Sequence, residues 1–477
     1  MANLIKFSPK NKFIQSVLAL AGGTIGAQII MLFATPFLTR LYSPTEFGFF
    51  AIYGSILAIF GIISCLRYEL AIPLPIKDAP AVNLVVICVF IVTLISAITA
   101  FIILVQSQLI SEFLGLEEVE YLFWALPVGI FFTGIYNVFT YWNIRKKKFG
   151  RIATTKLSQV VVALLIQFSA FKLGSIALVS GYLTGQAVSA ITLVKSFKPA
   201  LLAKYISWNS IKLTAIRYKQ FPLVSIWSGL INTLGSQLPT LVFATYFSVS
   251  AVGLFALANR FLAIPTALIG QSLGQVFLAH GAESSRSGDL RRIFLEIQDI
   301  LIRLGMPPAL IVVLVAPALF GIVFGSTWIQ SGQIVQYLML GTFFNFLVSP
   351  LAQVFNILEA QSLNLKLQIV LSALKISGIS LGIMQDDFML ATLYFSLGSA
   401  AGYFIYFFFC CKLVGLSILV SIKAMINGAI ASLLCCTPII FSMNLEYDGL
   451  IVLVGSLVAS LLIYFIFFQQ RMAKISL

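Results

Sequence analysis

Long apolar runs dominate this chain, and short polar connectors separate them. About fourteen runs are each roughly twenty residues long, the length that a helix needs to cross a bilayer core about 30 Å thick. The runs are continuous, whereas the strands of a membrane barrel would alternate with a period of two. Because lipid offers backbone groups no hydrogen-bond partner, continuous spans must be helical. The pattern therefore predicts an all-α polytopic membrane protein.

The apolar runs also give the expected number of crossings. A first half has spans near 15–38, 48–72, 83–105, 121–142, 153–171 and 175–194. A second half has spans near 221–247, 250–279, 293–320, 332–358, 363–384, 388–412, 418–440 and 449–468. The count of about fourteen falls to about twelve if two weak spans do not cross. Lysines precede the first run, as in a signal peptide, but the run is too long for one and predicts a retained span.

The connectors alternate between basic and acidic, and this alternation predicts the orientation. The basic side carries Arg145, Lys146, Lys147, Lys148, Arg151, Lys195, Lys198, Lys204, Lys212, Arg217, Lys219, Arg286, Arg291, Arg292, Arg471 and Lys474. The opposite side carries Glu112, Glu117, Glu118, Glu120, Asp386, Asp387, Glu446 and Asp448. The positive-inside rule places the basic connectors and both termini in the cytoplasm. The same rule accounts for the net charge of +14 without nucleic-acid binding.

The longest connector, 195–220, is the natural boundary between the two halves. It mixes lysines with Tyr205 and Trp208 and predicts an amphipathic segment on the inner membrane surface. A weak repeat supports two halves, because Phe47-Gly48 opens the second span and Val252-Gly253 the eighth. We predict a six-helix bundle over 1–194, the cytoplasmic linker over 195–220, a second six-helix bundle over 221–412, and two additional helices with a cytoplasmic tail over 413–477.

The sequence gives no evidence for the catalytic motifs of soluble enzymes. There is no GxxxxGK[ST] loop for a nucleotide phosphate. The six cysteines lie in or beside apolar runs, four of them as adjacent pairs, which suits neither a disulfide framework nor a metal site. We therefore expect a transporter that is not an enzyme and has neither cofactor nor metal.

Polar residues form stripes on several spans. Ser225, Ser228, Asn232, Ser236 and Thr240 share one face of the seventh span, Gln28 lies on a similar stripe of the first, and Gln271 on that of the eighth. Such residues join packed helices through hydrogen bonds, and stripes on several spans also favour a shared polar cavity. Close helix packing explains the GxxxG pairs, which begin at Gly22, Gly181, Gly270, Gly321, Gly378 and Gly398.

Charges inside the spans are the sharper signal, because each costs at least about 2.5–3.5 kcal/mol at the bilayer centre. Arg260 and Lys375 have no charged residue three or four positions away, so each needs a cavity, a partner helix or an anionic ligand. Arg303 follows Asp299 by four residues, which makes an internal ion pair at least as good an explanation as a ligand role. Near the end of the second span, Arg67 and Glu69 can also extend to the membrane surface.

Six strings of residues resemble the Wzx-type polysaccharide flippases of the multidrug/oligosaccharidyl-lipid/polysaccharide exporter superfamily. They are Leu38-Thr39-Arg40-Leu41-Tyr42-Ser43-Pro44-Thr45-Glu46-Phe47-Gly48, Leu66-Arg67-Tyr68-Glu69-Leu70-Ala71-Ile72, Trp142-Asn143-Ile144-Arg145 with Lys148-Phe149, Asn259-Arg260 with Pro265, Phe324-Gly325-Ser326-Thr327-Trp328, and Ser349-Pro350 with Val354-Phe355. The likeness runs from about residue 12 to residue 440, and the order and spacing of the strings carry it.

The resemblance implies two six-helix bundles around a central cavity that opens alternately to each side of the bacterial inner membrane. It implies transport of oligosaccharide units on undecaprenyl diphosphate, for O-antigen, capsule or exopolysaccharide synthesis, with a polysaccharide polymerase and a chain-length regulator as partners. On this reading the substrate-binding candidates are Arg260, Lys375, Arg67, Asn232, Gln28 and Gln271, and the coupling candidate is Glu69. A peptidoglycan lipid-precursor flippase and a multidrug or cation antiporter of the same superfamily stay open as alternatives.

Overall fold

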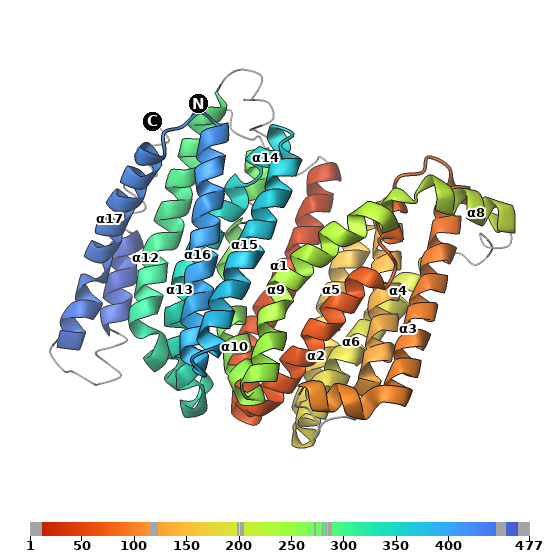
Figure 1. The fold of residues 1–477 in the computed structure, drawn as a ribbon, viewed down its shortest axis with the longest axis horizontal. Helices are drawn as coiled ribbons and strands as arrows, with labels where there is room; N and C mark the ends of the chain where they lie inside the picture. Colours follow the sequence, from red (N-terminus) through yellow and green to blue (C-terminus); the bar gives the residue numbers. More distant parts are fainter. Residues whose placement is uncertain are drawn as a thin grey trace. The chain divides into compact units, whose positions relative to one another are not determined.

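The computed structural model describes residues 12–114, 123–197, 200, 205–270, 273–278, 281, 284, 289–444 and 455–465. Every regular element in these ranges is a helix (Figure 1), which confirms the all-α prediction. Contacts within the chain divide it into two compact units, one from Phe7 to Ala256 and one from Leu257 to the end.

The predicted spans coincide with helices of the described residues. Eleven of these helices are long and apolar enough to cross a membrane. Two further helices of 21 residues, α4 (Ala125–Arg145) and α9 (Ile226–Tyr246), carry more polar residues. These two and the shorter apolar helix Gly455–Phe465 bring the total to the predicted fourteen.

The first unit is a bundle of antiparallel helices. Its other helices are α1 (Lys12–Leu41), α2 (Pro44–Ile63), α3 (Asp78–Leu114), α5 (Phe149–Ser169), α6 (Ser175–Val194), α8 (Trp208–Arg217) and the start of α10 (Val249–Pro265). Helix α5 packs against α1 and α6, α4 packs against α3 and α6, and α2 packs against α9. A buried apolar cluster around Trp142 and Val92 fills the space between α3 and α4.

The second unit contains the remaining long helices. They are α12 (Leu290–Phe324), α13 (Ile329–Leu351), α15 (Gln361–Ile383), α16 (Phe388–Leu413) and α17 (Ile418–Asn444), with the short α14 (Val354–Ile357). Helix α16 packs on both α13 and α15. A Cβ atom at Gly378 would overlap the backbone of Tyr394, and one at Gly398 would overlap the backbone of Leu374. The glycine pairs therefore bring α15 and α16 together, as their spacing predicts.

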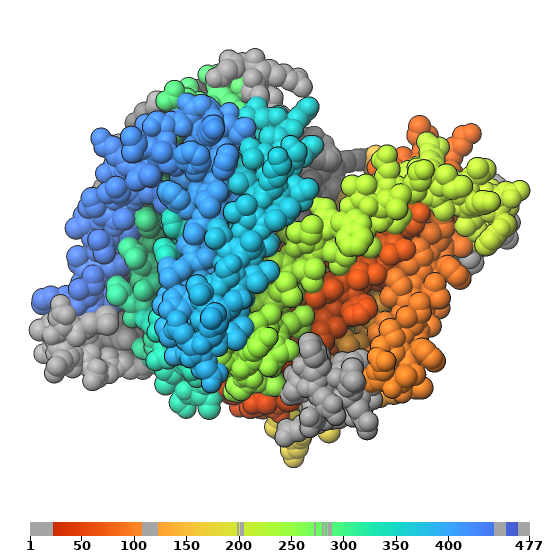
Figure 2. All heavy atoms as spheres, in the orientation of Figure 1, coloured from red at the N-terminus to blue at the C-terminus, as the bar shows by residue number. Residues whose placement is uncertain are grey.

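Outward-facing side chains of the second unit suit contact with lipid. Helices α15 and α17 lie on the surface shown in Figure 2, in cyan and blue. Leu419, Ile430 and Leu434 of α17 are more than half exposed. Because exposed leucine and isoleucine would be unfavourable in water, this surface agrees with the apolar spans of the sequence.

Helix α8, which lies within the predicted linker, has exposed apolar and buried residues. Trp208 is 80% exposed, and Leu213 (69%) and Ile216 (52%) lie three residues apart on an exposed face, whereas Thr214 is buried. On the buried side, the hydroxyl of Tyr68 donates to the carbonyl of Ala215 at 3.2 Å. The helix is thus attached to the first unit and leaves an apolar face free for the membrane surface.

The first unit extends beyond the predicted linker. Contacts assign α9 and the start of α10 to the unit that ends at Ala256, because α9 packs along α2. The boundary expected at 195–220 therefore does not coincide with the division by contacts. The sequence could not show this, since packing between α2 and α9 joins residues far apart in the chain.

The start of α2 explains much of the Leu38–Gly48 string. Ser43 and Glu46 form a capping box, in which the Ser43 hydroxyl accepts from the Glu46 amide and the Glu46 carboxylate accepts from the Ser43 amide. Pro44 occupies the first helical turn, where its missing N–H costs no hydrogen bond. Several residues of this string therefore form the N-terminal cap of α2.

The two glycines of the weak repeat lie against each other. A Cβ atom at Gly48 of α2 would overlap the carbonyl of Val249, and one at Gly253 of α10 would overlap the carbonyl of Pro44. The repeat thus marks a site of close backbone approach between α2 and α10.

We predict that Gly48→Ala and Gly253→Ala lower the thermal denaturation midpoint of the detergent-purified protein. The added methyl group must push two backbones apart, at a cost of about 1–3 kcal/mol. Gly22→Ala is the control, because a Cβ atom there meets nothing within 4 Å. Equal midpoints for all three variants would contradict the close approach.

Candidate functional site

The chain leaves the helical conformation soon after Ile63, earlier than the sequence predicts. Leu66 and Arg67 have φ angles of 47° and 65°, so two successive residues adopt the left-handed conformation. A short 3₁₀ helix, Tyr68–Ala71, follows. The prediction of one helix over 48–72 is therefore wrong at its end. Left-handed backbone is costly for residues other than glycine, and such strain often accompanies functional sites.

Arg67 and Glu69 form a weak, incomplete ion pair in this turn. Their nearest charged atoms, Arg67 Nη1 and Glu69 Oε1, lie 3.8 Å apart. The Glu69 side chain is 4% exposed and that of Arg67 25%. Arg67 Nε and Glu69 Oε2 are buried and have no hydrogen-bond partner within the part of the chain that the structure describes. Both side chains thus retain hydrogen-bonding capacity at largely buried positions.

A cavity of about 250 Å³ adjoins this pair within the first unit. Its walls come from α2, α4, α6 and the turn after α2. The lining residues are Gly54, Leu57, Ala58, Gly61, Ile62, Arg67, Glu69, Thr133, Asn137, Tyr141 and Tyr182. Thr133, Asn137 and Tyr141 are four residues apart on α4 and share one helix face. This spacing was a signal for a polar site that the sequence interpretation missed.

Neighbouring segments hold the turn in place. Arg145 at the end of α4 pairs with Asp78 at the start of α3, with 2.9 Å between Nη2 and Oδ1. The same nitrogen donates to the carbonyl of Lys77 at 3.0 Å. On another side, a Cβ atom at Gly229 of α9 would lie 3.4 Å from Arg67 Nε. The guanidinium group of Arg67 therefore lies directly against the backbone of α9 at Gly229.

Burial raises the pKa of Glu69, which lies between α2 and α3 outside the candidate spans, from 4.5 to about 7. Desolvation is the largest cause, and a backbone hydrogen bond and the attraction of Arg67 oppose it. Glu69 can therefore gain or lose a proton near neutral pH.

Arg260 lies in the second half of α10 and is half-buried. Within the described part of the chain it forms no ion pair and no hydrogen bond. Directly after it, the ring of Phe261 packs against that of Phe320 with 5.3 Å between centroids. Pro265 then ends the regular α-helix, and a π-helical turn, Thr266–Gly270, follows. Irregular turns of this kind occur frequently at functional sites.

Lys375 has an internal partner that Arg260 lacks. It lies on α15, and its Nζ is 5.1 Å from the ring centroid of Tyr403 on α16. A cation–π contact of this length partly compensates the loss of water around the ammonium group. Lys375 is therefore a weaker candidate for a ligand contact than Arg260.

The other predicted site residues are dispersed. Gln28 is half-buried on α1, and Asn232 is exposed on α9 and does not line the cavity. Gln271 lies outside the described residues. Of the predicted site residues, Arg67 and Glu69 line one cavity of the first unit.

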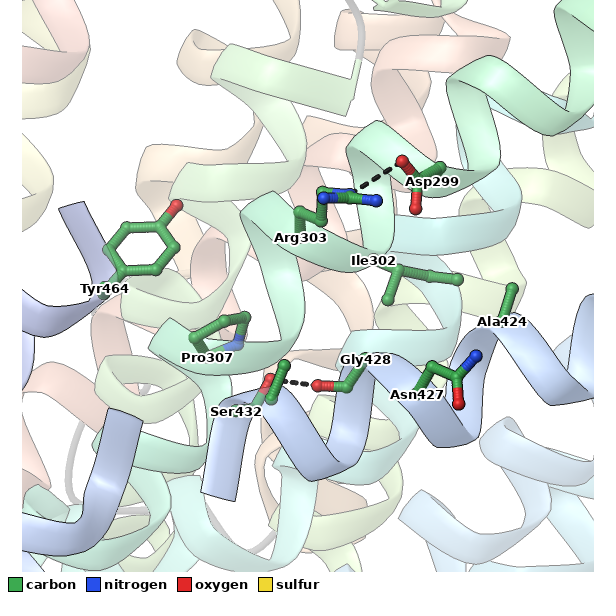
Figure 3. Close-up of a pocket in the computed structure, with 10 residues that line it drawn as sticks. Asp299, Ile302, Arg303, Pro307, Ala424, Asn427, Gly428, Ser432 and Tyr464 are labelled. Atoms are coloured by element: carbon green, nitrogen blue, oxygen red, sulfur yellow. Dashed lines mark hydrogen bonds and ion pairs between the residues drawn. The ribbon is translucent and has the colours of Figure 1, made fainter. Parts of the chain in front are cut away.

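The expected ion pair of α12 is confirmed. Arg303 Nε donates to Asp299 Oδ2 at 2.7 Å (Figure 3). The pair lines a pocket of about 180 Å³ together with Asn427 and Ser432 of α17 and Tyr464 of the helix Gly455–Phe465. Arg303 thus has its own counter-charge, in contrast to Arg260.

The polysaccharide biosynthesis protein family matches residues 37–333, which is more than half of the chain. The chain belongs to this family. The matched region contains the Arg67–Glu69 cavity and Arg260. No curated protein sequence matches the chain significantly.

Solved structures confirm the fold. The lipid II flippase MurJ in an inward closed conformation has a TM-score of 0.74 and 14% identity, over 96% of this chain and 99% of that one. An inward-facing multidrug resistance MATE transporter of the MOP superfamily has a TM-score of 0.59 and 12% identity, over 83% and 94%. A MATE transporter from Vibrio cholerae has a TM-score of 0.54 and 14% identity, over 84% of this chain and 96% of that one. The family and fold inferred from the sequence strings are therefore confirmed.

We predict that Glu69 makes the thermal stability of the family member pH-dependent. Between the ordinary pKa of 4.5 and the raised value of about 7, the folded protein binds a proton that the unfolded chain has released. The resulting stability is complete below pH 4.5 and is lost as the pH rises through 7. The denaturation midpoint in detergent should fall by about 5 °C across this range. Glu69→Gln should remove this fall, and an unchanged slope in the variant would contradict the assignment.

Proposed function

We propose that the protein is a flippase for oligosaccharide repeat units linked to undecaprenyl diphosphate. It moves them by alternating access from the cytoplasmic to the periplasmic leaflet of the bacterial inner membrane, for O-antigen, capsule or exopolysaccharide synthesis. Membership of a polysaccharide biosynthesis family supports this proposal, as does the fold that the chain shares with a lipid II flippase. Both termini are cytoplasmic, and a polymerase and a chain-length regulator receive the product.

One observation carries the proposal, namely that Arg260 lies in a candidate membrane span without a counter-charge among the described residues. A diphosphate cannot cross hydrocarbon unless cationic or hydrogen-bonding groups replace its water. Arg260 is a cation in a membrane-spanning helix without a counter-charge among the described residues. Its guanidinium group can bind phosphate oxygens through two parallel hydrogen bonds. Lys375 assists Arg260, and Arg67, Gln28, Asn232 and Gln271 contact the other polar groups of the substrate.

Two carboxylates of α12 argue against a cation exporter. Such a transporter needs acidic groups that are free to bind a cationic drug. Asp299 is instead paired with Arg303, and Glu296 with Arg292 at 2.9 Å. Arginine therefore neutralises both carboxylates, and this pairing favours an anionic substrate.

A peptidoglycan lipid-precursor flippase is the second candidate, because its substrate is also a polyprenyl diphosphate sugar. The similarity to MurJ favours it. Complementation separates the two functions: cells depleted of their own lipid II flippase survive on this protein only if the second candidate is correct.

We predict that Arg260→Ala abolishes export while leaving the membrane abundance of the protein unchanged. The assay measures surface polysaccharide in cells that lack the native gene, and we expect a loss of at least about tenfold because one bidentate phosphate contact is removed. Arg260→Lys should restore only part of the activity, since an ammonium group keeps the charge without the fork. Full activity of Arg260→Ala would remove this residue from the mechanism.

We further predict that Glu69 couples transport to the proton gradient. The groups that face it are Arg67 in the same turn, Tyr141 of α4 and Cys88 of α3. Because its pKa is about 7, Glu69 is protonated in part at neutral pH and can release the proton when its surroundings change. In proteoliposomes, wild-type transport should rise with an imposed pH gradient, whereas Glu69→Gln should show no response. Persistence of the wild-type gradient dependence in Glu69→Gln would dismiss the coupling role.

A further inference from the structure

Three residues that line the Arg67–Glu69 cavity each carry a buried polar side-chain atom without a hydrogen-bond partner among the described residues. The atoms are Arg67 Nε, which can only donate a hydrogen bond, Glu69 Oε2, which accepts one when ionised, and Thr133 Oγ1, which can do both. Leaving a buried polar atom unpaired costs about 1–3 kcal/mol. Three such atoms around one space are therefore typical of a place that a hydrogen-bonding ligand fills.

The charges of the cavity favour a neutral ligand. The nearest charged atoms of Arg67 and Glu69 are 3.8 Å apart, so the pair carries no net charge when Glu69 is ionised. A phosphate group would be attracted by Arg67 and repelled by Glu69. A cation would be attracted by Glu69 and repelled by Arg67. A ligand that donates to the carboxylate and accepts from the guanidinium group satisfies both side chains, and adjacent hydroxyl groups do this.

The remaining walls suit the faces of a sugar ring. Tyr141 and Tyr182 contribute aromatic rings, and Asn137 contributes an amide that both donates and accepts. A Cβ atom at Gly54 would meet nothing within 4 Å, so this wall of α2 is flat and open. The cavity of about 250 Å³ lies below the roughly 300–1,000 Å³ that drug-sized ligands occupy. It has room for one ring and not for an oligosaccharide.

We propose that this cavity is a binding site for one neutral pyranose ring of the transported saccharide. Arg67, Glu69, Thr133 and Asn137 bind its hydroxyl groups, and Tyr141 and Tyr182 pack on its C–H faces. The assignment rests on the proposed function and deepens it, because it separates recognition of a sugar from recognition of the diphosphate. The strained turn after α2 places the charged pair against α4, where the ring would lie.

Gly54 offers a way to close the cavity. Gly54→Leu places an isobutyl group in open space, so the helix backbone need not move. Gly150→Leu is the matched control, because a Cβ atom there also meets nothing within 4 Å and the residue does not line the cavity. Thr133→Val is a second, nearly isosteric variant that removes one of the three unpartnered atoms.

Saturation-transfer difference NMR on the full chain in nanodiscs tests the site. The probes are the methyl glycosides of glucose, galactose and N-acetylglucosamine, with inorganic phosphate and tetramethylammonium as charged comparisons. We expect at least one glycoside to bind the wild type and Gly150→Leu with a dissociation constant on the order of 1 mM. Gly54→Leu should lose this signal, and Thr133→Val should weaken binding by about tenfold, roughly the effect of one hydrogen bond. Absence of every glycoside signal in the wild type, or an undiminished signal in Gly54→Leu, would overturn the proposal.

A transport assay on the same proteins separates this site from the proposed function. Proteoliposomes loaded with a lipid-linked oligosaccharide report translocation, which Gly54→Leu should reduce at least tenfold relative to Gly150→Leu. A wild type that translocates the lipid but binds no glycoside would keep the proposed function and reject the sugar site. A wild type that binds glycosides through the cavity but translocates no lipid-linked oligosaccharide would reject the proposed function.

Discussion

The inability of hydrocarbon to solvate charge is the constraint on which the rest of this structure depends. It forces the apolar runs into helices, since no other conformation of an open chain satisfies the backbone. It also means that each charge within or beside a span needs a partner or a purpose. Arg303 has a partner in Asp299, and Lys375 has one in the ring of Tyr403. Arg260 has neither an ion pair nor a hydrogen bond among the described residues.

The charged pair of the first unit, Arg67 and Glu69, is arranged differently from the Asp299–Arg303 pair. Arg67 and Glu69 lie in a turn whose left-handed backbone costs energy, beside a cavity that leaves hydrogen-bonding atoms of both unsatisfied. A pair that served stability alone would complete its hydrogen bonds. Strain, burial and unsatisfied atoms in one place are better explained by a ligand or a proton that comes and goes.

Several strings that suggested the family have roles in folding. Ser43 and Glu46 begin α2 as a capping box, and Arg145 fixes the loop before α3 through Asp78. Gly48 allows a close approach to α10. These residues bring helix ends together and keep the backbone satisfied. The family resemblance therefore reports the architecture more directly than the substrate, which depends on the residues of the sites.

The sequence by itself determined the helical class and the positions of the long apolar helices, because a bilayer of constant thickness leaves one solution for a continuous apolar run. It also determined the Asp299–Arg303 pair, since residues four apart on a helix are neighbours. The end of α2 at Ile63 and the packing of α9 in the first unit became clear only from the tertiary structure. The cavity likewise needed three helices and a turn to assemble around Glu69. Contacts between distant segments decide such features, and no local pattern of residues encodes them.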